Sequence, residues 1–164
     1  ADVQYDFKIL TAVMEVNADQ KTKLIPRIKD YYHGNLKGKV FAMWGLSFKP
    51  HTDDIREAPA LYNIEELINA GAIVKAHDPE SMENVQRLLG DKSQFWKTPY
   101  EAAKGADAIF IATKWPEFRT PDFDKISSGL KSKVIFDGRN LYDLQQMKDL
   151  GYTYFSIGRE TIYG

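Results

Sequence analysis

The sequence predicts an α/β fold, a Rossmann-like doubly wound parallel sheet with a long N-terminal helix. Two observations predict it. From residue 39 onward, short apolar segments alternate with segments whose apolar residues recur at helical spacing. Strands with few polar positions are typical of a parallel sheet that helices cover on both faces. Before residue 33 the sequence has instead one long helical pattern. We therefore divide the chain into a helix, residues 1–34, and a domain, residues 35–164.

The first predicted element is a helix over residues 5–32. Pro26 lies inside its pattern and is expected to kink or interrupt it. At about 1.5 Å per residue this helix would be about 42 Å long, too long to pack wholly on one small domain. We expect it to pack against a preceding domain or a partner chain, although a helix cut short by the end of the chain fits the same pattern. Its apolar positions are Ile9, Leu10, Val13, Met14, Leu24, Ile25 and Ile28.

The alternating region begins after a polar turn at residues 33–39. An apolar strand is predicted at 39–44 and a helix at 57–70, with Pro59 near its first turn and Gly71 at its end. The later segments keep the alternation, and the segment "DPES" is expected to cap the next helix. Further strands are predicted at 73–77, 95–97, 107–113, 133–137 and 152–157, and further helices up to residue 89 and at 99–104, 122–130 and 141–150.

Composition limits the possible functions. The chain has 164 residues, 43% apolar and 27% charged, which fits one soluble domain with an extension. Its net charge of −1 disfavours broad binding to nucleic acid or to an anionic membrane. It has no cysteine, which excludes disulfides, thiolate metal sites and a thiol nucleophile in this chain, and its three histidines lack metal-ligand spacing. No segment has the length of a membrane span or the form of a signal peptide, so we expect a cytoplasmic protein.

Three segments are expected at the carboxyl ends of strands, where parallel sheets bind ligands. They are the loop that starts at Gly45, the segment "HDP" at 77–79 and the segment "DGRNLY" at 137–142. Lys49, Arg56 and Arg139 would bring three cations to this edge, and such groups suit phosphate or pyrophosphate. Lys49 and Arg56 could equally be solvated charges paired with the neighbouring acids Asp53, Asp54 and Glu57.

The loop after the first strand is a poor dinucleotide fingerprint. Gly45 can make the tight turn, but Ser47 and Pro50 stand where a GxGxxG loop needs glycines, and proline has no N–H to donate. Asp53 and Asp54 also make a poor phosphate-acceptor pair, because the first strand ends in Trp44 rather than in an acid.

Two residues near this edge have alternative interpretations. Asp78 follows the second strand, where nicotinamide-binding folds place an acid on the ribose, but an Asp before Pro more often turns the chain and caps a helix. We favour the turn. Trp115 ends another strand and is interpreted as a rim or interface aromatic, with base stacking as the alternative.

Together these segments resemble the C-terminal part of the UDP-glucose/GDP-mannose dehydrogenase family. The resemblance runs in order over nearly the whole chain, and its more specific parts are "GLSFKPHTDDIREAP" at 45–59 and "DGRNLY" at 137–142. "ILTAVMEVNADQK", "HDPES", "DAIFIATKWPEF" and "GYTYFSIGR" add to it, although Lys114 stands where many relatives have an acid. "TKWPEF" and "GRNLYD" favour the UDP-glucose branch.

The resemblance implies a function in two parts. The family oxidises the C6 hydroxyl of UDP-glucose to a carboxylate by two hydride transfers to two NAD+, through a thiohemiacetal or thioester on a cysteine. An N-terminal domain binds NAD, a long helix forms a homodimer, and the C-terminal domain holds the UDP part of the sugar nucleotide. This chain would correspond to the long helix and the UDP-binding domain. Without the cysteine and the NAD domain, it would carry no catalytic residue and be inactive alone.

By the same resemblance, Phe48, Lys49 and Arg139 would bind UDP, and Arg56 would reach toward NAD on the other domain. Asn17 and Gln20 match a VNxxQ motif, for which we expect packing or interface roles. The same domain of a GDP-mannose or UDP-N-acetyl-hexosamine dehydrogenase, or a purely structural dimerisation module, is the alternative. No nucleic acid, membrane or metal is expected as a partner.

Overall fold

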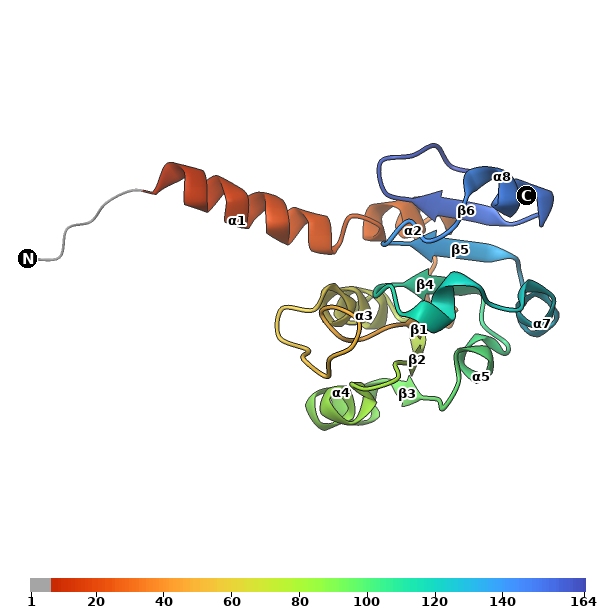
Figure 1. Cartoon of the computed structure of the whole chain (residues 1–164), viewed down its shortest axis with the longest axis horizontal. Helices are drawn as coiled ribbons and strands as arrows, with labels where there is room; N and C mark the ends of the chain where they lie inside the picture. The colour runs from red at the N-terminus through yellow and green to blue at the C-terminus, as the bar shows by residue number, and fades with distance from the viewer. Residues whose placement is uncertain (1–6) are drawn as a thin grey trace, which may run out of the picture.

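The computed structural model describes residues 7–164 and shows the predicted helical extension (Figure 1). The extension consists of helix α1, Lys8–Lys21, and helix α2, Ile25–Tyr31, joined by a short turn. Pro26 lies in the first turn of α2, where its missing N–H costs no helical hydrogen bond, so the expected interruption is confirmed. The first residues of the predicted helix 5–32 lie outside the described part of the chain.

Six parallel strands form one sheet in the order β3-β2-β1-β4-β5-β6. This is the doubly wound order, and it reverses between β1 and β4, which pair through residues such as Phe41 and Ala108. The predicted fold class is therefore confirmed. The strands are β1, Val40–Trp44; β2, Ile73–His77; β3, Gln94–Phe95; β4, Ala108–Ile111; β5, Val134–Asp137; and β6, Thr153–Ser156.

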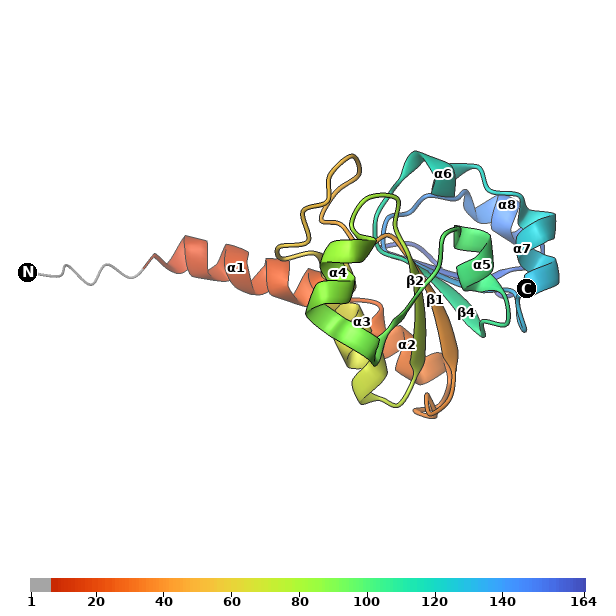
Figure 2. The same ribbon diagram turned by 90° about the horizontal axis from the view of Figure 1, so that it is seen from below.

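Helices cover both faces of the sheet, and each face has its own hydrophobic core (Figure 2). Alternate residues of β1 serve the two cores, since Phe41 and Met43 belong to one and Ala42 and Trp44 to the other. Helices α2, α3 (Pro59–Asn69) and α4 (Met82–Leu89) pack on the first face. The second face carries α5 (Pro99–Ala103), α6 (Pro116–Arg119), α7 (Phe123–Gly129) and α8 (Leu144–Asp149), and a 3-10 helix η1 (Gly90–Lys92) follows α4.

Two helices begin two or three residues later than the sequence predicts, and two short helices, α6 and η1, are new. The predicted helix 57–70 begins only at Pro59, because Glu57 has a positive φ of 56°, which a helix does not accommodate. The predicted helix 141–150 starts at Leu144, where the side chain of Asp143 accepts a hydrogen bond from the amide of Gln146. Helix α6 was not predicted. None of the described helices is both long and apolar enough to cross a membrane.

Gly45 makes the turn out of β1, as its position predicts. Its φ is +89°, in the region that side chains rarely adopt, and its N–H donates to the carbonyl of His77 at 2.8 Å. An added Cβ would lie 2.5 Å from Cβ of Thr113 and 2.8 Å from its backbone nitrogen. Glycine is therefore required here by backbone conformation and by the close approach of the segment after β4.

Gly45→Ala should destabilise the fold by at least about 2 kcal/mol, because the new methyl group meets both a strained φ and the backbone of Thr113. Gly105→Ala is the matched control: it has a similar φ of +72° but open space around the added Cβ, so it should cost only about 1 kcal/mol. Urea unfolding measures both, and equal losses would contradict the close-packing argument.

Candidate functional site

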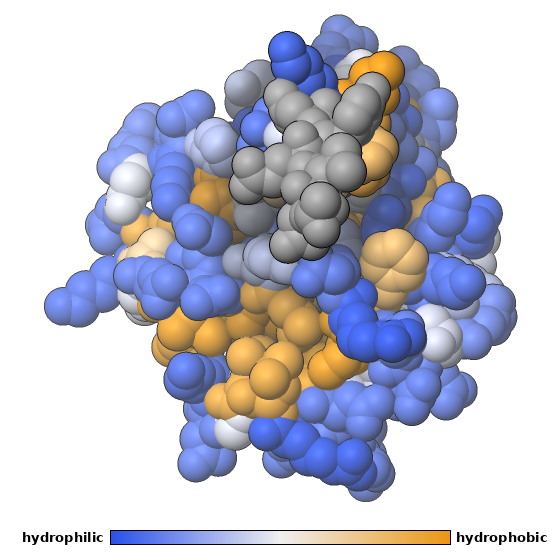
Figure 3. All heavy atoms as spheres, turned by 90° about the vertical axis from the view of Figure 1, so that its left-hand side faces the viewer, coloured by the Kyte–Doolittle hydropathy of each residue, from blue (hydrophilic) through white to orange (hydrophobic). Residues whose placement is uncertain are grey.

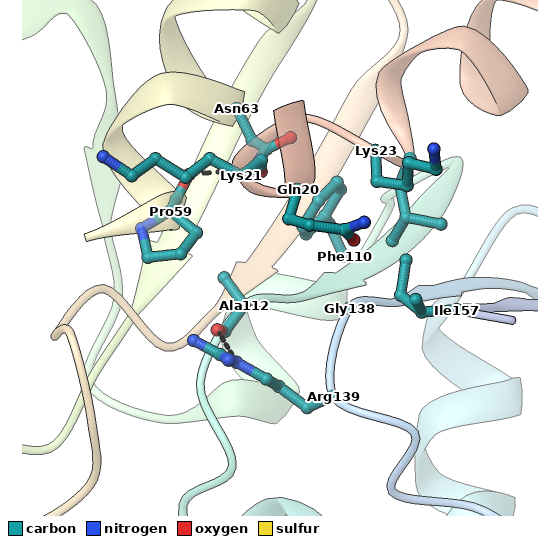
Figure 4. A pocket seen from close by; sticks show the side chains of 11 residues that line it. Gln20, Lys21, Lys23, Pro59, Asn63, Phe110, Ala112, Gly138, Arg139 and Ile157 are labelled. Carbon is teal, nitrogen blue, oxygen red and sulfur yellow. Dashed lines mark hydrogen bonds between the residues drawn. The ribbon is translucent and has the colours of Figure 1, made fainter. Parts of the chain in front are cut away.

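A cavity of about 1020 Å³ opens where α1 passes the carboxyl ends of the central strands. Its walls come from the last turns of α1, the loop after β1, the start of α3 and the loop after β5. A narrower pocket of about 60 Å³ shares several of these residues and extends toward Phe110 and Ala112 of the β4 segment (Figure 4). The cavity-lining residues with polar or aromatic side chains include Asn17, Gln20, Lys21, Phe48, Tyr62 and Arg139.

Arg139 is half-buried in the wall of this cavity. Its Nε donates a hydrogen bond of 2.6 Å to the carbonyl of Ala112, as Figure 4 shows. Burial lowers the pKa of Arg139, an effect that the charge of Asp137 opposes, and an arginine remains charged at neutral pH. Among the described residues, the guanidinium makes no further hydrogen bond. Its remaining N–H donors are therefore available to an anion in the cavity.

The loop that carries Arg139 is fixed by Asp137, the last residue of β5. The buried carboxylate accepts hydrogen bonds from the amides of Arg139 and Leu141 and from the hydroxyl of Tyr154, each at 2.7 Å. Burial raises the pKa of Asp137 in spite of these hydrogen bonds. Asn140 continues the loop with a φ of +55°, and its side-chain amide pairs with the backbone of Ile157. Arg139 thus stands on a rigid support.

The loop after β1 contributes Phe48 to the cavity. Its side chain is 49% exposed, and its N–H donates to the carbonyl of Asp54 at 2.8 Å, which closes the base of the loop. Lys49 is exposed and does not line the cavity. The structure therefore gathers two of the three predicted UDP-binding residues, Phe48 and Arg139, at one cavity, together with Asn17 and Gln20 of α1.

Arg56 is placed elsewhere. Its guanidinium makes a two-point contact with Asp54, with Nε at 3.0 Å from Oδ1 and Nη2 at 2.8 Å from Oδ2, and this contact lowers the pKa of Asp54 to about 2. Arg56 also borders a hollow of about 680 Å³ between α3 and α4. Figure 3 shows apolar side chains gathered on this side of the molecule, and those that line the hollow include Leu61, Ile68, Leu88 and Leu89.

Sequence reasoning missed the contacts that hold α1 against α3. The ammonium of Lys21 contacts the carboxylate of Glu57 and lies 4.4 Å from the ring centre of Tyr62. The hydrogen bond with Glu57 raises the pKa of Lys21 and lowers that of Glu57. Buried Asn63 donates to the carbonyls of Lys21 and Pro59, at 2.7 Å each. An amide among the apolar positions of a helix was the available sequence signal for Asn63.

Asp78, immediately after β2, is fully buried beside the loop after β1. Its Oδ2 accepts from the amides of Leu46 at 2.7 Å and Ser47 at 3.1 Å, and from the indole nitrogen of Trp115 at 2.9 Å. Its Oδ1 accepts from the amides of Glu80 and Ser81, at 2.9 Å each. Burial acts to raise the pKa of Asp78, but the backbone hydrogen bonds outweigh it, so the pKa lies below its ordinary value.

These contacts decide between the alternatives left open for Asp78 and Trp115. Asp78 turns the chain, as favoured, and its carboxylate is too occupied and too buried to reach a ribose. The interpretation of Trp115 as a rim aromatic was wrong. Trp115 is only 5% exposed, because its indole N–H donates a hydrogen bond to the buried Asp78. Its ring also contacts that of His51, at a centroid distance of 5.3 Å.

Comparison with known protein families adds a match. A family model for the UDP binding domain of the UDP-glucose/GDP-mannose dehydrogenase family matches residues 42–144. Among curated proteins, the chain is 41% identical over 160 residues to the UDP-glucose 6-dehydrogenase of Pseudomonas aeruginosa. That match covers 94% of this chain and 35% of the relative. The chain spans about a third of the length of the curated relatives it matches.

Solved structures with the same fold include two archaeal enzymes. A UDP-glucose dehydrogenase from Pyrobaculum islandicum is 32% identical, with a TM-score of 0.69 over 79% of this chain and 28% of that one. A UDP-D-ManNAc dehydrogenase from Pyrococcus horikoshii is 26% identical, with a TM-score of 0.75 over 96% of this chain and 35% of that one. This second alignment includes nearly all of the chain.

Asn63→Leu should loosen α1 and destabilise the fold by about 1–3 kcal/mol, because the carbonyls of Lys21 and Pro59 would lose their shared donor. Asn69→Leu, an exposed site on the same helix, is the control and should change stability by no more than about 0.5 kcal/mol. Hydrogen exchange of the α1 amides, read with urea unfolding, measures both effects. Unchanged exchange in Asn63→Leu would show that Asn63 does not hold α1.

Proposed function

The chain belongs to the UDP-glucose/GDP-mannose dehydrogenase family, and from that premise we propose that it is the UDP-binding part of an NAD-dependent UDP-glucose 6-dehydrogenase. The whole enzyme would convert UDP-glucose, two NAD+ and water to UDP-glucuronate. The observation that carries the proposal is the cavity beside Arg139, because it joins a fixed arginine, an exposed aromatic ring and two side-chain amides in a space suited to a nucleotide.

Two groups in the cavity, Arg139 and Phe48, suit parts of a uridine diphosphate. The unpaired edge of the Arg139 guanidinium offers forked donors that fit phosphate oxygens. Phe48 presents an aromatic face that can pack on a base or ribose. Lys49, next to Phe48 and outside the cavity wall, would approach the ribose and phosphate as a flexible point charge. We therefore keep Phe48, Lys49 and Arg139 as the proposed UDP site.

The proposed cofactor, NAD, does not fit the β1 loop of this chain. The loop has a single glycine, the amides of Leu46 and Ser47 already donate to Asp78, and Pro59 removes an N–H from the start of α3. NAD would bind the domain found in the longer relatives, and Arg56 would reach toward it after exchanging its contact with Asp54. The hydride transfers and the cysteine chemistry would also belong to that domain, so this chain alone should be inactive.

The diphosphate is inferred from Arg139, whereas the sugar and base are inferred from the relatives. The 41% identity to a UDP-glucose 6-dehydrogenase favours UDP-glucose, whereas the relative from Pyrococcus horikoshii carries the name of a UDP-D-ManNAc dehydrogenase. The same domain of a UDP-N-acetyl-hexosamine or GDP-mannose dehydrogenase is therefore the alternative. A binding experiment with competing nucleotides distinguishes these possibilities.

A second proposal concerns assembly: α1 forms a homodimer interface. None of the described residues of α1 is buried, although the helix carries an apolar stripe whose exposed fractions are 84% for Ile9, 56% for Leu10 and 50% for Val13. Such a stripe on a helix that projects from its domain (Figure 1) is typical of a surface that another helix covers.

UDP should bind the isolated chain weakly, with a dissociation constant in the high micromolar to millimolar range, about −4 to −6 kcal/mol. A two-dimensional NMR titration should show shifts at Phe48, Lys49 and Arg139, with smaller responses to GDP and none at these residues with NAD+. Arg139→Gln should weaken binding at least about tenfold, because the forked phosphate donors are lost. Lys49→Ala should remove the shifts near the ribose and phosphate.

Lys37→Gln serves as the control, because it removes one positive charge from an exposed site before β1, at the amino ends of the strands and away from the cavity. It should leave UDP affinity unchanged. A wild-type chain that shows no shift with UDP at several millimolar would contradict a preformed site, and a response to NAD+ alone would overturn the assignment. A stronger response to GDP than to UDP would instead support the GDP-mannose alternative.

Val13→Glu should convert a dimer of the chain to a monomer, because it places a charge in the apolar stripe of α1. Thr11→Glu adds the same charge on the opposite side of the helix by spacing and should leave the dimer intact. Size-exclusion chromatography with light scattering measures both masses. A monomeric wild-type chain at tens of micromolar would contradict the assembly proposal.

A further inference from the structure

The loop after β1 already holds an anion, and that anion is part of the protein. Two consecutive amides, those of Leu46 and Ser47, converge on one carboxylate oxygen of Asp78. Successive backbone N–H groups that point to one spot form an anion-binding nest, the device with which phosphate loops hold pyrophosphate. Here the nest faces inward, and the carboxylate fills it from the end of the neighbouring strand.

The arrangement compensates a buried charge without a cation. Among the described residues, no lysine, arginine or histidine pairs with Asp78, whose side chain is fully buried. Its donors are instead four backbone amides, the indole of Trp115 and, at 3.3 Å, the hydroxyl of Ser47. Because so many fixed dipoles point at one carboxylate, the negative form is the one that this site stabilises.

Asp78 holds the loop after β1 at the point where it leaves the sheet. Ser47 is held at its N–H by Asp78 and at its carbonyl by the hydroxyl of Thr113, at 2.6 Å. Phe48, the next residue, is the first exposed one of the loop. The position from which the Phe48 ring projects into the cavity therefore depends on the two contacts of Ser47.

We propose that Asp78 is a positioning residue that takes the place of a phosphate in the amide nest of the β1 loop, so that the loop offers a nucleotide the side chain of Phe48 instead of backbone N–H groups. Recognition of the diphosphate then falls to side chains, above all Arg139. The effect on nucleotide binding rests on the proposed UDP site, whereas the effect on the loop can be measured without any nucleotide.

Chemical rescue tests this role. Asp78→Ala leaves a space of carboxylate shape beside the nest, which formate fits and neutral formamide fits equally well. In the variant, exchange of the Leu46 and Ser47 amides should accelerate, and UDP binding should weaken, each at least about tenfold. Formate should restore both toward wild type, and formamide should not. Donors face both oxygens of Asp78, so formate can accept at both positions, whereas the NH2 group of formamide would face N–H donors at one of them.

Two controls separate rescue from a general salt effect. Asp124→Ala removes an exposed carboxylate from α7 and should show no response to formate. Trp115→Phe removes one donor but keeps the carboxylate, so the Leu46 and Ser47 amides should stay protected without formate. If Asp78→Ala is unfolded, recovery of its circular dichroism by formate and not by formamide supports the proposal in the same way.

Three results would overturn the proposal: Asp78→Ala with wild-type exchange and UDP affinity, equal rescue by formate and formamide, or no effect of formate on the folded or unfolded variant. A wild-type chain that does not bind UDP would contradict the proposed UDP site but not the role of Asp78. In that case formate-dependent protection of Leu46 and Ser47 would still support the positioning of the loop by Asp78.

Discussion

The buried carboxylate of Asp78 is the interaction on which the structure at the carboxyl ends of the strands depends. It ties together the segments that follow β1, β2 and β4, because its donors come from Leu46 and Ser47, from Glu80 and Ser81, and from Trp115. A buried charge with this many fixed donors tolerates little movement, since any lost hydrogen bond leaves polar groups unpaired in a medium of low polarity. The edge is therefore rigid before any ligand binds.

A second aspartate repeats the same principle on the other side of the switch point. Asp137 ends β5 and holds the amides of Arg139 and Leu141, as Asp78 holds those of the β1 loop. Their pKa values move in opposite directions: burial prevails and raises that of Asp137, whereas backbone hydrogen bonds prevail and lower that of Asp78. In both cases a strand-end carboxylate fixes a loop from within and leaves the next side chains, Phe48 and Arg139, facing the cavity.

The sequence predicted most strands well because they are short and mostly apolar, and β2 matches its expected range at both ends. The strand β3, Gln94–Phe95, is the exception, because it overlaps the predicted strand 95–97 only at Phe95. The sequence predicted the cavity only in part. Phe48 and Arg139 both line it, whereas Arg56 pairs with Asp54, as expected by the alternative interpretation of Arg56 as a charge paired with a neighbouring acid. Which of the three neighbouring acids it pairs with depends on loop geometry that no periodicity encodes. The burial of Trp115 was not predicted from the sequence, because its hydrogen-bond partner Asp78 lies 37 positions away in the chain. Local sequence patterns indicate which residues are apolar, but they do not indicate which distant acceptor forms a hydrogen bond with a buried indole.

The β1 loop needs fewer glycines than a dinucleotide-binding loop because its amides bind the carboxylate of Asp78 and not a phosphate. In a dinucleotide loop, the second glycine allows a phosphate to approach the backbone closely, and the third allows close packing of helix and strand. When a carboxylate arrives from inside, no ligand needs to touch the backbone, so Ser47 can keep its hydroxyl and Pro50 can lack an N–H. Only Gly45 is still required, by its φ and by Thr113. A single glycine followed by an aspartate at the end of the next strand is therefore consistent with a phosphate loop whose anion has become internal, and it explains why this sheet retains the dinucleotide-binding topology without its fingerprint.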